Sequence, residues 1–173
     1  MAVPDDVTLQ PADVDDAGEL LTLQRAAYVT EAQLHDDLWL PPLVQSLAEL
    51  RGELERSTAF KVVTREGRIV AGVRVAVEAG SAHVNRLAVA PDWQGRGLGT
   101  ALLEHVHATL PEGVSRVELF TGSRSLANLR LYERLGYAEF DRTLLPNGHE
   151  LVHLRRPVVP ASDRGTGHDV VTG

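Results

Sequence analysis

Cysteine is absent from this chain of 173 residues, and lysine occurs only once, at Lys61. Without cysteine the protein has no disulfide bond, no thiolate zinc site and no cysteine nucleophile. Long apolar segments are also missing, since none approaches the roughly 18 residues of a membrane-spanning helix. The first residues are acidic where a signal peptide is basic. These absences predict a cytoplasmic protein that does not associate with a membrane.

Positive charge is scarce as well. The chain has 17 lysine and arginine residues against 24 aspartate and glutamate residues, which gives a net charge of -7. A chain this acidic is poorly suited to bind the phosphate backbone of nucleic acids. The imbalance lies in residues 1–60, where twelve acidic residues against three arginines give a charge of -9. The remainder carries +2, which is compatible with an anionic ligand.

The composition, with 43% hydrophobic and 24% charged residues, is typical of one compact domain. We assign this domain to residues 1–156. Residues 157–173 contain prolines, glycines and small polar residues without periodicity, which predicts a C-terminal tail.

Apolar residues repeat at helical spacing before residue 57. The pattern predicts a first helix that Asp13 caps, and a second helix that follows Pro41–Pro42. The second helix carries an apolar stripe made of Leu43, Leu47, Leu50 and Leu54. Residues 29–40, between the two helices, are expected to form a loop that ends in Trp39.

From residue 59 the apolar pattern has a period of two, which is typical of strands. A short strand is also expected at Val7–Leu9, and helices at about 98–110 and 126–135. The remaining predicted strands are 59–65, 68–77, 82–90, 116–121, 138–145 and 149–155. This order predicts an α+β fold (mixed α/β), with a largely antiparallel twisted sheet of about seven strands flanked by about four helices.

The most informative segment joins a predicted strand to a predicted helix and has glycines at alternate positions, Gly95, Gly97 and Gly99. Glycines let the backbone approach an anion, and the free N–H groups at a helix start point toward it. We therefore expect a phosphate or pyrophosphate site. A P-loop would need a lysine, and a dinucleotide fingerprint would need glycine at Thr100, so these two alternatives and a plain turn fit less well.

Two motifs resemble the GNAT N-acetyltransferase superfamily. The segment Gln94-Gly95-Arg96-Gly97-Leu98-Gly99 resembles the pyrophosphate loop of that family, and the run NLRLYERLGY from Asn128 to Tyr137 resembles one of its helices. The order of predicted elements extends the resemblance over residues 5–156. It implies a GNAT-like fold and acetyl-coenzyme A (acetyl-CoA) as co-substrate.

The resemblance also implies which residues bind acetyl-CoA. A strand would pair with the pantetheine arm, a loop and helix start would bind the pyrophosphate, and a helix side chain would contact the coenzyme. These residues are, in order, Leu87, Ala88 and Val89; Gln94, Gly95, Arg96, Gly97, Leu98, Gly99 and Thr100; and Asn128.

The resemblance assigns Tyr132 as the general acid, although a buried aromatic of the core is an alternative reading. A phenol, with a pKa of about 10, can protonate a leaving thiolate, whose thiol has a pKa of about 8.5. Many relatives have a glutamate on the strand before the loop as general base, and this sequence has none there. His83 is the candidate for that role, because it alternates with Asn85 toward the predicted face of Leu87 and Val89.

The acidic first third is expected to form a wall of the acceptor groove. Its candidate substrate-binding residues are Tyr28, Asp36, Asp37 and Trp39, which suit a cationic amine. The histidine pairs of the sequence lack a third ligand, so we expect no metal site.

Together these features predict an enzyme that transfers an acetyl group from acetyl-CoA to a primary amine, by direct attack in a ternary complex. A small cationic amine is the expected acceptor. A protein N-terminus or lysine is the alternative acceptor, and a non-catalytic acetyl-CoA-binding module is the alternative class. No nucleic-acid or membrane partner is expected, and a homodimer is left open.

Overall fold

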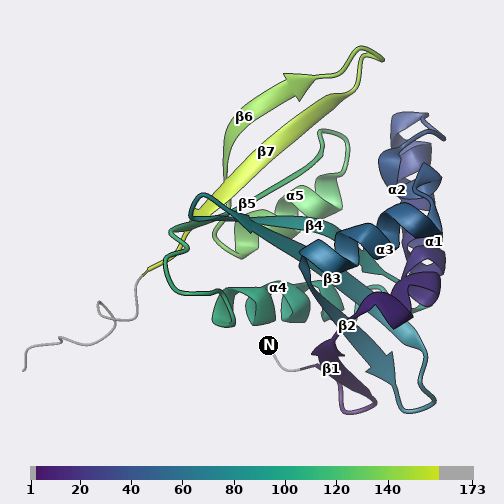
Figure 1. The fold of residues 1–173 in the computed structure, drawn as a ribbon. Helices are drawn as coiled ribbons and strands as arrows, with labels where there is room; N and C mark the ends of the chain where they lie inside the picture. The colour runs from purple at the N-terminus through teal and green to yellow at the C-terminus, as the bar shows by residue number, and fades with distance from the viewer. Residues whose placement is uncertain (1–2, 160–173) are drawn as a thin grey trace, which may run out of the picture.

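A computed structural model of the chain describes residues 3–159. Its centre is one seven-stranded sheet with the strand order β1-β2-β3-β4-β5-β7-β6 (Figure 1). The strands are β1 (Val7–Pro11), β2 (Thr58–Thr64), β3 (Ile69–Glu78), β4 (Ser81–Val89), β5 (Arg116–Gly122), β6 (Ala138–Leu144) and β7 (Glu150–Pro157). Only β4 and β5 pair in parallel. The predicted fold class, a largely antiparallel sheet of about seven strands, is confirmed.

The helices are α1 (Ala17–His35), α2 (Pro41–Val44), α3 (Leu47–Arg56), α4 (Leu98–Ala108) and α5 (Leu126–Arg134), with 3-10 turns η1 (Val14–Asp16) and η2 (Pro91–Trp93). Two expectations were wrong. The first helix continues to His35 through residues that were expected to form a loop. The helix after Pro41 is interrupted, because Ser46 is extended and caps α3 together with Glu49 in a capping box.

The helices cover both faces of the sheet. Gly72 and Arg74 of β3 face α1, where a Cβ atom on Gly72 would lie 3.0 Å from Leu20. The glycine at position 72 therefore lets α1 approach the sheet closely. On the opposite face α4 packs near β2, where the ring of Phe60 meets His105 edge-on.

Ion pairs attach the N-terminal helices to the sheet. The Lys61 ammonium lies 2.6 Å from Asp16 and is largely buried. The guanidinium of Arg74, also buried, lies 3.1 Å from Glu53 on α3 and donates to Gln24 on α1. Partly buried pairs of this kind fix the relative position of the elements that they join.

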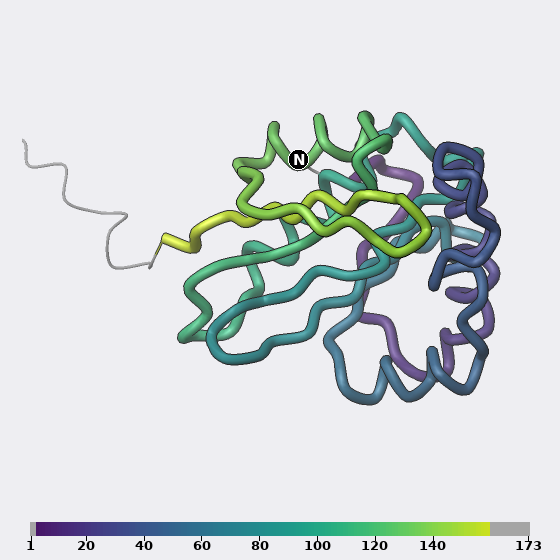
Figure 2. The backbone as a smooth tube through the Cα atoms, turned by 90° about the horizontal axis from the view of Figure 1, so that it is seen from above, coloured from purple at the N-terminus to yellow at the C-terminus, as the bar shows by residue number. Residues whose placement is uncertain are grey.

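The β6–β7 hairpin extends toward the C-terminal end of α1, as the view from above shows (Figure 2). Asn147 in the hairpin turn donates to Asp37, and the ring of His149 meets that of His35. The hairpin and the end of α1 thus close the same end of the molecule.

Within residues 3–159, no helix has the length and apolar character needed to cross a membrane. The division into a domain at 1–156 and a tail stays a prediction, since most of the tail lies outside the described residues. Val158, at its start, still bonds to Ser115 through the backbone.

His107 is a partly buried histidine at the end of α4. Its Nε2 atom lies 2.7 Å from the Tyr137 hydroxyl, and Arg156 contacts its Nδ1 atom. An arginine can only donate, so Nδ1 is the acceptor and the ring is neutral. Burial, with the charge of Arg156, lowers the pKa of His107 to about 4.

We predict that this histidine destabilises the fold in acid. Its pKa is lower in the folded state, so its contribution is complete above the unfolded pKa of about 6.5 and is lost as the pH falls toward 4. The loss should reach about 2 kcal/mol near pH 4.5. The variant His107→Gln should reduce the difference in unfolding free energy between about pH 7.5 and about pH 4.5 by this amount in urea titrations. An unchanged difference would contradict the assignment.

Candidate active site

The site lies where two neighbouring strands separate. β4 and β5 pair only over Ser81–His83 and Arg116–Glu118, and beyond this point the strands part. A cavity of about 850 Å³ fills the gap and extends between α1, α4 and α5. A cavity of this size can hold the reacting ends of two substrates.

A β-bulge in β4 shapes the wall of the gap. Gly72 of β3 pairs with Ala88 and Arg74 pairs with Asn85, so β4 has one residue more than β3 over this stretch. Arg86, at the bulge, has the left-handed φ value of 54°. Bulges of this kind bend a strand and re-aim the residues that follow.

Beyond the bulge the backbone of β4 faces the cavity. The N–H group of Ala90 bonds to Val70 on β3. Because alternate peptide groups of a strand point to opposite edges, those of Leu87 and Val89 face the gap. The Tyr28 hydroxyl lies 3.5 Å from the Leu87 carbonyl, on that side. The predicted pantetheine-binding strand therefore turns the peptide groups of Leu87 and Val89 toward the cavity, where their carbonyls accept hydrogen bonds from the side chains of Tyr28 and Gln94.

The glycine loop forms the other end of the cavity. Gly95 and Gly97 have φ values of 76° and 79°, and Gly97 is the N-cap of α4. Only glycine adopts this conformation without strain, and the N–H groups at the start of α4 point toward the cavity end. The arrangement fits a pyrophosphate.

Most of the predicted coenzyme residues line the cavity: Leu87, Ala88, Val89, Gln94, Gly95, Gly97, Leu98, Gly99, Thr100 and Asn128. Arg96 does not. Its guanidinium lies over the ring of Trp93 and 3.2 Å from Asp6, so it is engaged on the outer side of the loop.

Tyr132 lines the cavity from α5 and is 6% exposed. Burial raises its pKa above that of a free phenol, and Tyr28, Tyr137 and Glu31 raise it further. The side chain is therefore a protonated phenol at neutral pH, as a proton donor must be. Tyr28 and Glu31 line the same cavity as Tyr132.

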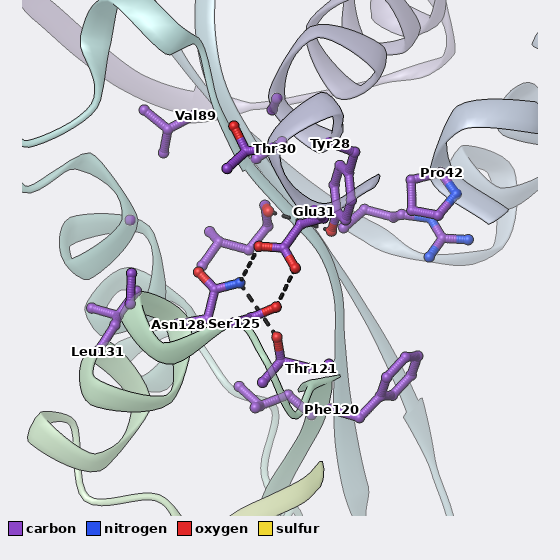
Figure 3. Close-up of a pocket in the computed structure, with 18 of the residues that line it drawn as sticks. Tyr28, Thr30, Glu31, Pro42, Val89, Phe120, Thr121, Ser125, Asn128 and Leu131 are labelled. Atoms are coloured by element: carbon purple, nitrogen blue, oxygen red, sulfur yellow. Dashed lines mark hydrogen bonds between the residues drawn. The ribbon is translucent and has the colours of Figure 1, made fainter. Parts of the chain in front are cut away.

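Glu31 is the residue that the sequence analysis missed. Figure 3 shows its carboxylate pointing toward Ser125 and Asn128. The Ser125 hydroxyl donates a short hydrogen bond to one carboxylate oxygen, and the Asn128 amide donates to the other at 3.3 Å. The nearest basic side chain is His35, at 3.7 Å. Burial lowers the pKa of His35, so Glu31 has no permanent cationic partner there.

The spacing of residues along α1 could have indicated Glu31 as a site residue. Tyr28, Glu31 and His35 stand three and four residues apart, so they share one face of α1. All three line the cavity. Because residues 29–40 were expected to form a loop, the shared helix face of these three residues was not predicted.

Besides Arg96, three predicted site residues lie outside the cavity lining. His83 precedes the bulge, which breaks the alternation used to place it, and its Nδ1 atom lies 3.8 Å from Glu118. Asp36 ends α1 in a left-handed conformation, and Trp39 is 81% exposed. The structure thus offers no contact between these residues and the cavity.

Two predicted acceptor residues do line it. Tyr28 does so from α1, and Asp37 from the segment that follows. Asp37 is engaged, since it accepts from the Trp39 N–H group and from Asn147. In residues 3–159 no group of three or more side chains is arranged to hold a metal ion.

Comparison with known proteins gives a consistent result. Residues 56–139 match the family model described as an acetyltransferase (GNAT) domain. The chain is 35% identical over 115 residues to the [ribosomal protein bS18]-alanine N-acetyltransferase of Escherichia coli K12, an alignment that covers 66% of this chain and 74% of the relative. It is 28% identical over 111 residues to the S-(2-succino)cysteine N-acetyltransferase of Bacillus subtilis, an alignment that covers 58% of this chain and 67% of that relative.

Solved structures show the same fold. The crystal structure of the Escherichia coli ribosomal-protein-S18-alanine N-acetyltransferase superposes with a TM-score of 0.74 at 23% identity, over 92% of this chain and 99% of that one. With the two predicted motifs on the walls of one cavity and a relative at 35% identity, the chain belongs to the GNAT family of N-acetyltransferases, acyltransferases that use acetyl-CoA.

Proposed function

We propose that the protein transfers the acetyl group of acetyl-CoA to the primary amine of a small molecule, which arrives as an ammonium ion. One observation supports this most. A carboxylate without a cationic partner, Glu31, and a protonated phenol, Tyr132, come together where β4 and β5 part. A base and an acid beside one gap are what direct attack of an amine on a thioester requires.

The cavity fits acetyl-CoA as the donor. The N–H groups of Leu87 and Val89 would donate to the pantetheine arm, and the N–H groups of residues 95–100 would bind the pyrophosphate. The free N–H group of Val89 is also placed to donate to the thioester oxygen, on which negative charge develops during attack.

Two side chains, Glu31 and Tyr132, would carry out the proton transfers of the reaction. The ammonium ion gives one proton to Glu31, and the resulting amine nitrogen forms a bond to the thioester carbon. The carbon–sulfur bond breaks, and Tyr132 protonates the departing thiolate. The second proton of the amine nitrogen leaves to solvent, Glu31 releases the proton that it accepted to solvent, and Tyr132 takes one proton back from solvent. The product is an N-acetyl amine and free coenzyme A.

The shape of the cavity favours a compact acceptor. The hydrogen bond from Asn147 to Asp37 closes one end, and Leu145, His149 and Leu151 of the hairpin line it. A second acceptor, the N-terminal amine of a protein, is favoured by the 35% identity to the [ribosomal protein bS18]-alanine N-acetyltransferase. Release of free coenzyme A, measured with small amines and with peptides that begin with alanine, tests the proposal. If wild-type protein binds acetyl-CoA but no amine is acetylated, the chain is a binding module instead.

Tyr132→Phe removes the phenol proton and keeps the ring. We expect kcat to fall by about 10²-fold or more, with the Kd of acetyl-CoA nearly unchanged, because the proton is needed only when the thiolate leaves. Steady-state kinetics and calorimetric titration measure the two effects.

Tyr137→Phe is the matched control, since Tyr137 lies outside the cavity lining and bonds to His107. It should lower stability and leave kcat near that of the wild type. Wild-type turnover by Tyr132→Phe would remove Tyr132 from the mechanism.

Glu31→Gln keeps the shape of the side chain and removes its charge. We expect kcat/KM for a strongly basic amine to fall by about 10²-fold near neutral pH, and the loss to shrink as the pH approaches the pKa of the free amine. A weakly basic amine, which arrives neutral, should be affected less. Coenzyme A release measured against pH for both amines gives this comparison.

The control for this variant is Glu55→Gln, on the exposed face of α3. It makes the same change of charge at a distance from the cavity and should leave both pH profiles as in the wild type. Equal losses for basic and weakly basic amines in Glu31→Gln would mean that Glu31 only holds Ser125 and Asn128 in place.

A further inference from the structure

Arg86 is a cavity-lining arginine without a partner. No hydrogen bond or ion pair joins its side chain to any residue in the range 3–159, and its Nε atom is buried without an acceptor. Arg74, its neighbour across the bulge, is different. Its guanidinium is held by Glu53 and Gln24. Among the described residues, the structure thus provides partners for the buried Arg74 and none for the half-buried Arg86.

An arginine in this state is costly to the fold. A buried donor without a partner destabilises the folded state, and the effect is larger when the group is charged. Arg86 also sits at the left-handed residue of the bulge, a conformation that is strained for a side chain with a Cβ atom. Arginine is well suited to bind a carboxylate with two parallel hydrogen bonds. An anionic group of a ligand that bonds to the Arg86 guanidinium would remove this destabilisation.

The other charged side chains of the cavity do not supply that anion. Asp37 accepts from Asn147 and the Trp39 backbone, and Glu150 lies 2.7 Å from Arg142. The remaining arginine of the cavity lining, Arg134, is a cation and is exposed at the end of α5. Glu31 is bonded to neutral groups and lies more than 4.0 Å from Arg86, since the two form no ion pair.

Arg86 and Glu31 are both neighbours of Tyr28: the Tyr28 hydroxyl lies 3.5 Å from the carbonyl of Leu87, the residue after Arg86, and Glu31 follows Tyr28 by three residues on α1. The charges of both reach its hydroxyl group: Arg86 favours the ionised form of the phenol and Glu31 disfavours it. Burial is the larger influence and raises the pKa of Tyr28. The free cation and the free anion therefore line the same cavity, beside Tyr28.

We propose that the acceptor is a free amino acid or a close analogue, with its ammonium group directed to Glu31 and its carboxylate bound by the guanidinium of Arg86. The proposal rests on the proposed function, since Glu31 receives the amine that is acetylated. It distinguishes two kinds of acceptor. The N-terminus of a peptide has a neutral amide where a free amino acid has a carboxylate, and a neutral amide leaves the Arg86 charge unpaired.

The experiment compares each amino acid with its own carboxamide. Coenzyme A release is measured for a panel of free L-amino acids and for the matched α-carboxamides, with wild-type protein and with Arg86→Gln. We expect the wild type to prefer the acid, and Arg86→Gln to lower the acid-to-amide ratio of kcat/KM by about 10- to 100-fold, the range for a lost charged hydrogen bond. Arg86→Lys, which keeps the charge but not the planar fork, should retain part of the preference.

Arg51→Gln is the matched control, because Arg51 is exposed on α3 and the change of charge is the same. Its acid-to-amide ratio should equal that of the wild type. Circular dichroism and thermal unfolding show whether Arg86→Gln is folded, and the ratio within one variant is independent of the folded fraction.

Two failures are distinguishable. If the wild type acetylates carboxamides or simple amines as well as acids, or if Arg86→Gln lowers both rates equally, the assignment of Arg86 is overturned while the acetyltransferase function stands. If no amine releases coenzyme A, the proposed function fails. Calorimetric titration of the same acids and amides into protein saturated with coenzyme A then still tests Arg86, and equal binding of acid and amide would overturn it.

Discussion

The separation of β4 from β5 after three paired residues is the constraint on which the site depends. Paired strands would bury their peptide groups in a ladder, and α1 and α5 would face each other across a closed sheet. The bulge at Arg86 bends β4 away instead, so that Leu87 and Val89 present backbone groups to an open gap. Unpaired backbone groups of this kind are stable only when solvent or a ligand bonds to them. The defect in the sheet therefore serves as the place where a ligand adds its own hydrogen bonds.

Much of the fold was predictable because its signals are local. The strands alternate, the glycine loop precedes a helix and the Asn128–Tyr137 run is contiguous, so each could be recognised without knowledge of tertiary contacts. The acceptor side was not predictable in this way. His83 was placed by an alternation that the bulge interrupts, and a bulge has no clear signature in a strand of ordinary residues. Glu31 depended on a helix that continues beyond its expected end.

The acidity of the first third acquires a different meaning in the structure. Asp13 and Glu49 cap helices, Asp16 pairs with Lys61 and Glu53 pairs with Arg74, so much of this charge is used to hold the N-terminal helices on the sheet. Counting charges suggested a broad acidic wall. Our proposal instead assigns the chemistry to one carboxylate, Glu31, because a charge acts most strongly where no counter-ion is close.

The single lysine gives this enzyme an unusual chemical property. Acetyl-CoA is a reactive thioester that acetylates exposed amines and thiols without catalysis, and an acetyltransferase is the protein most often close to it. This chain has no thiol, and the one side-chain ammonium it carries is 16% exposed and held by Asp16 at 2.6 Å. A protonated, ion-paired amine is a poor nucleophile. The protein therefore has neither a thiol nor a freely exposed side-chain amine that its own co-substrate could acetylate.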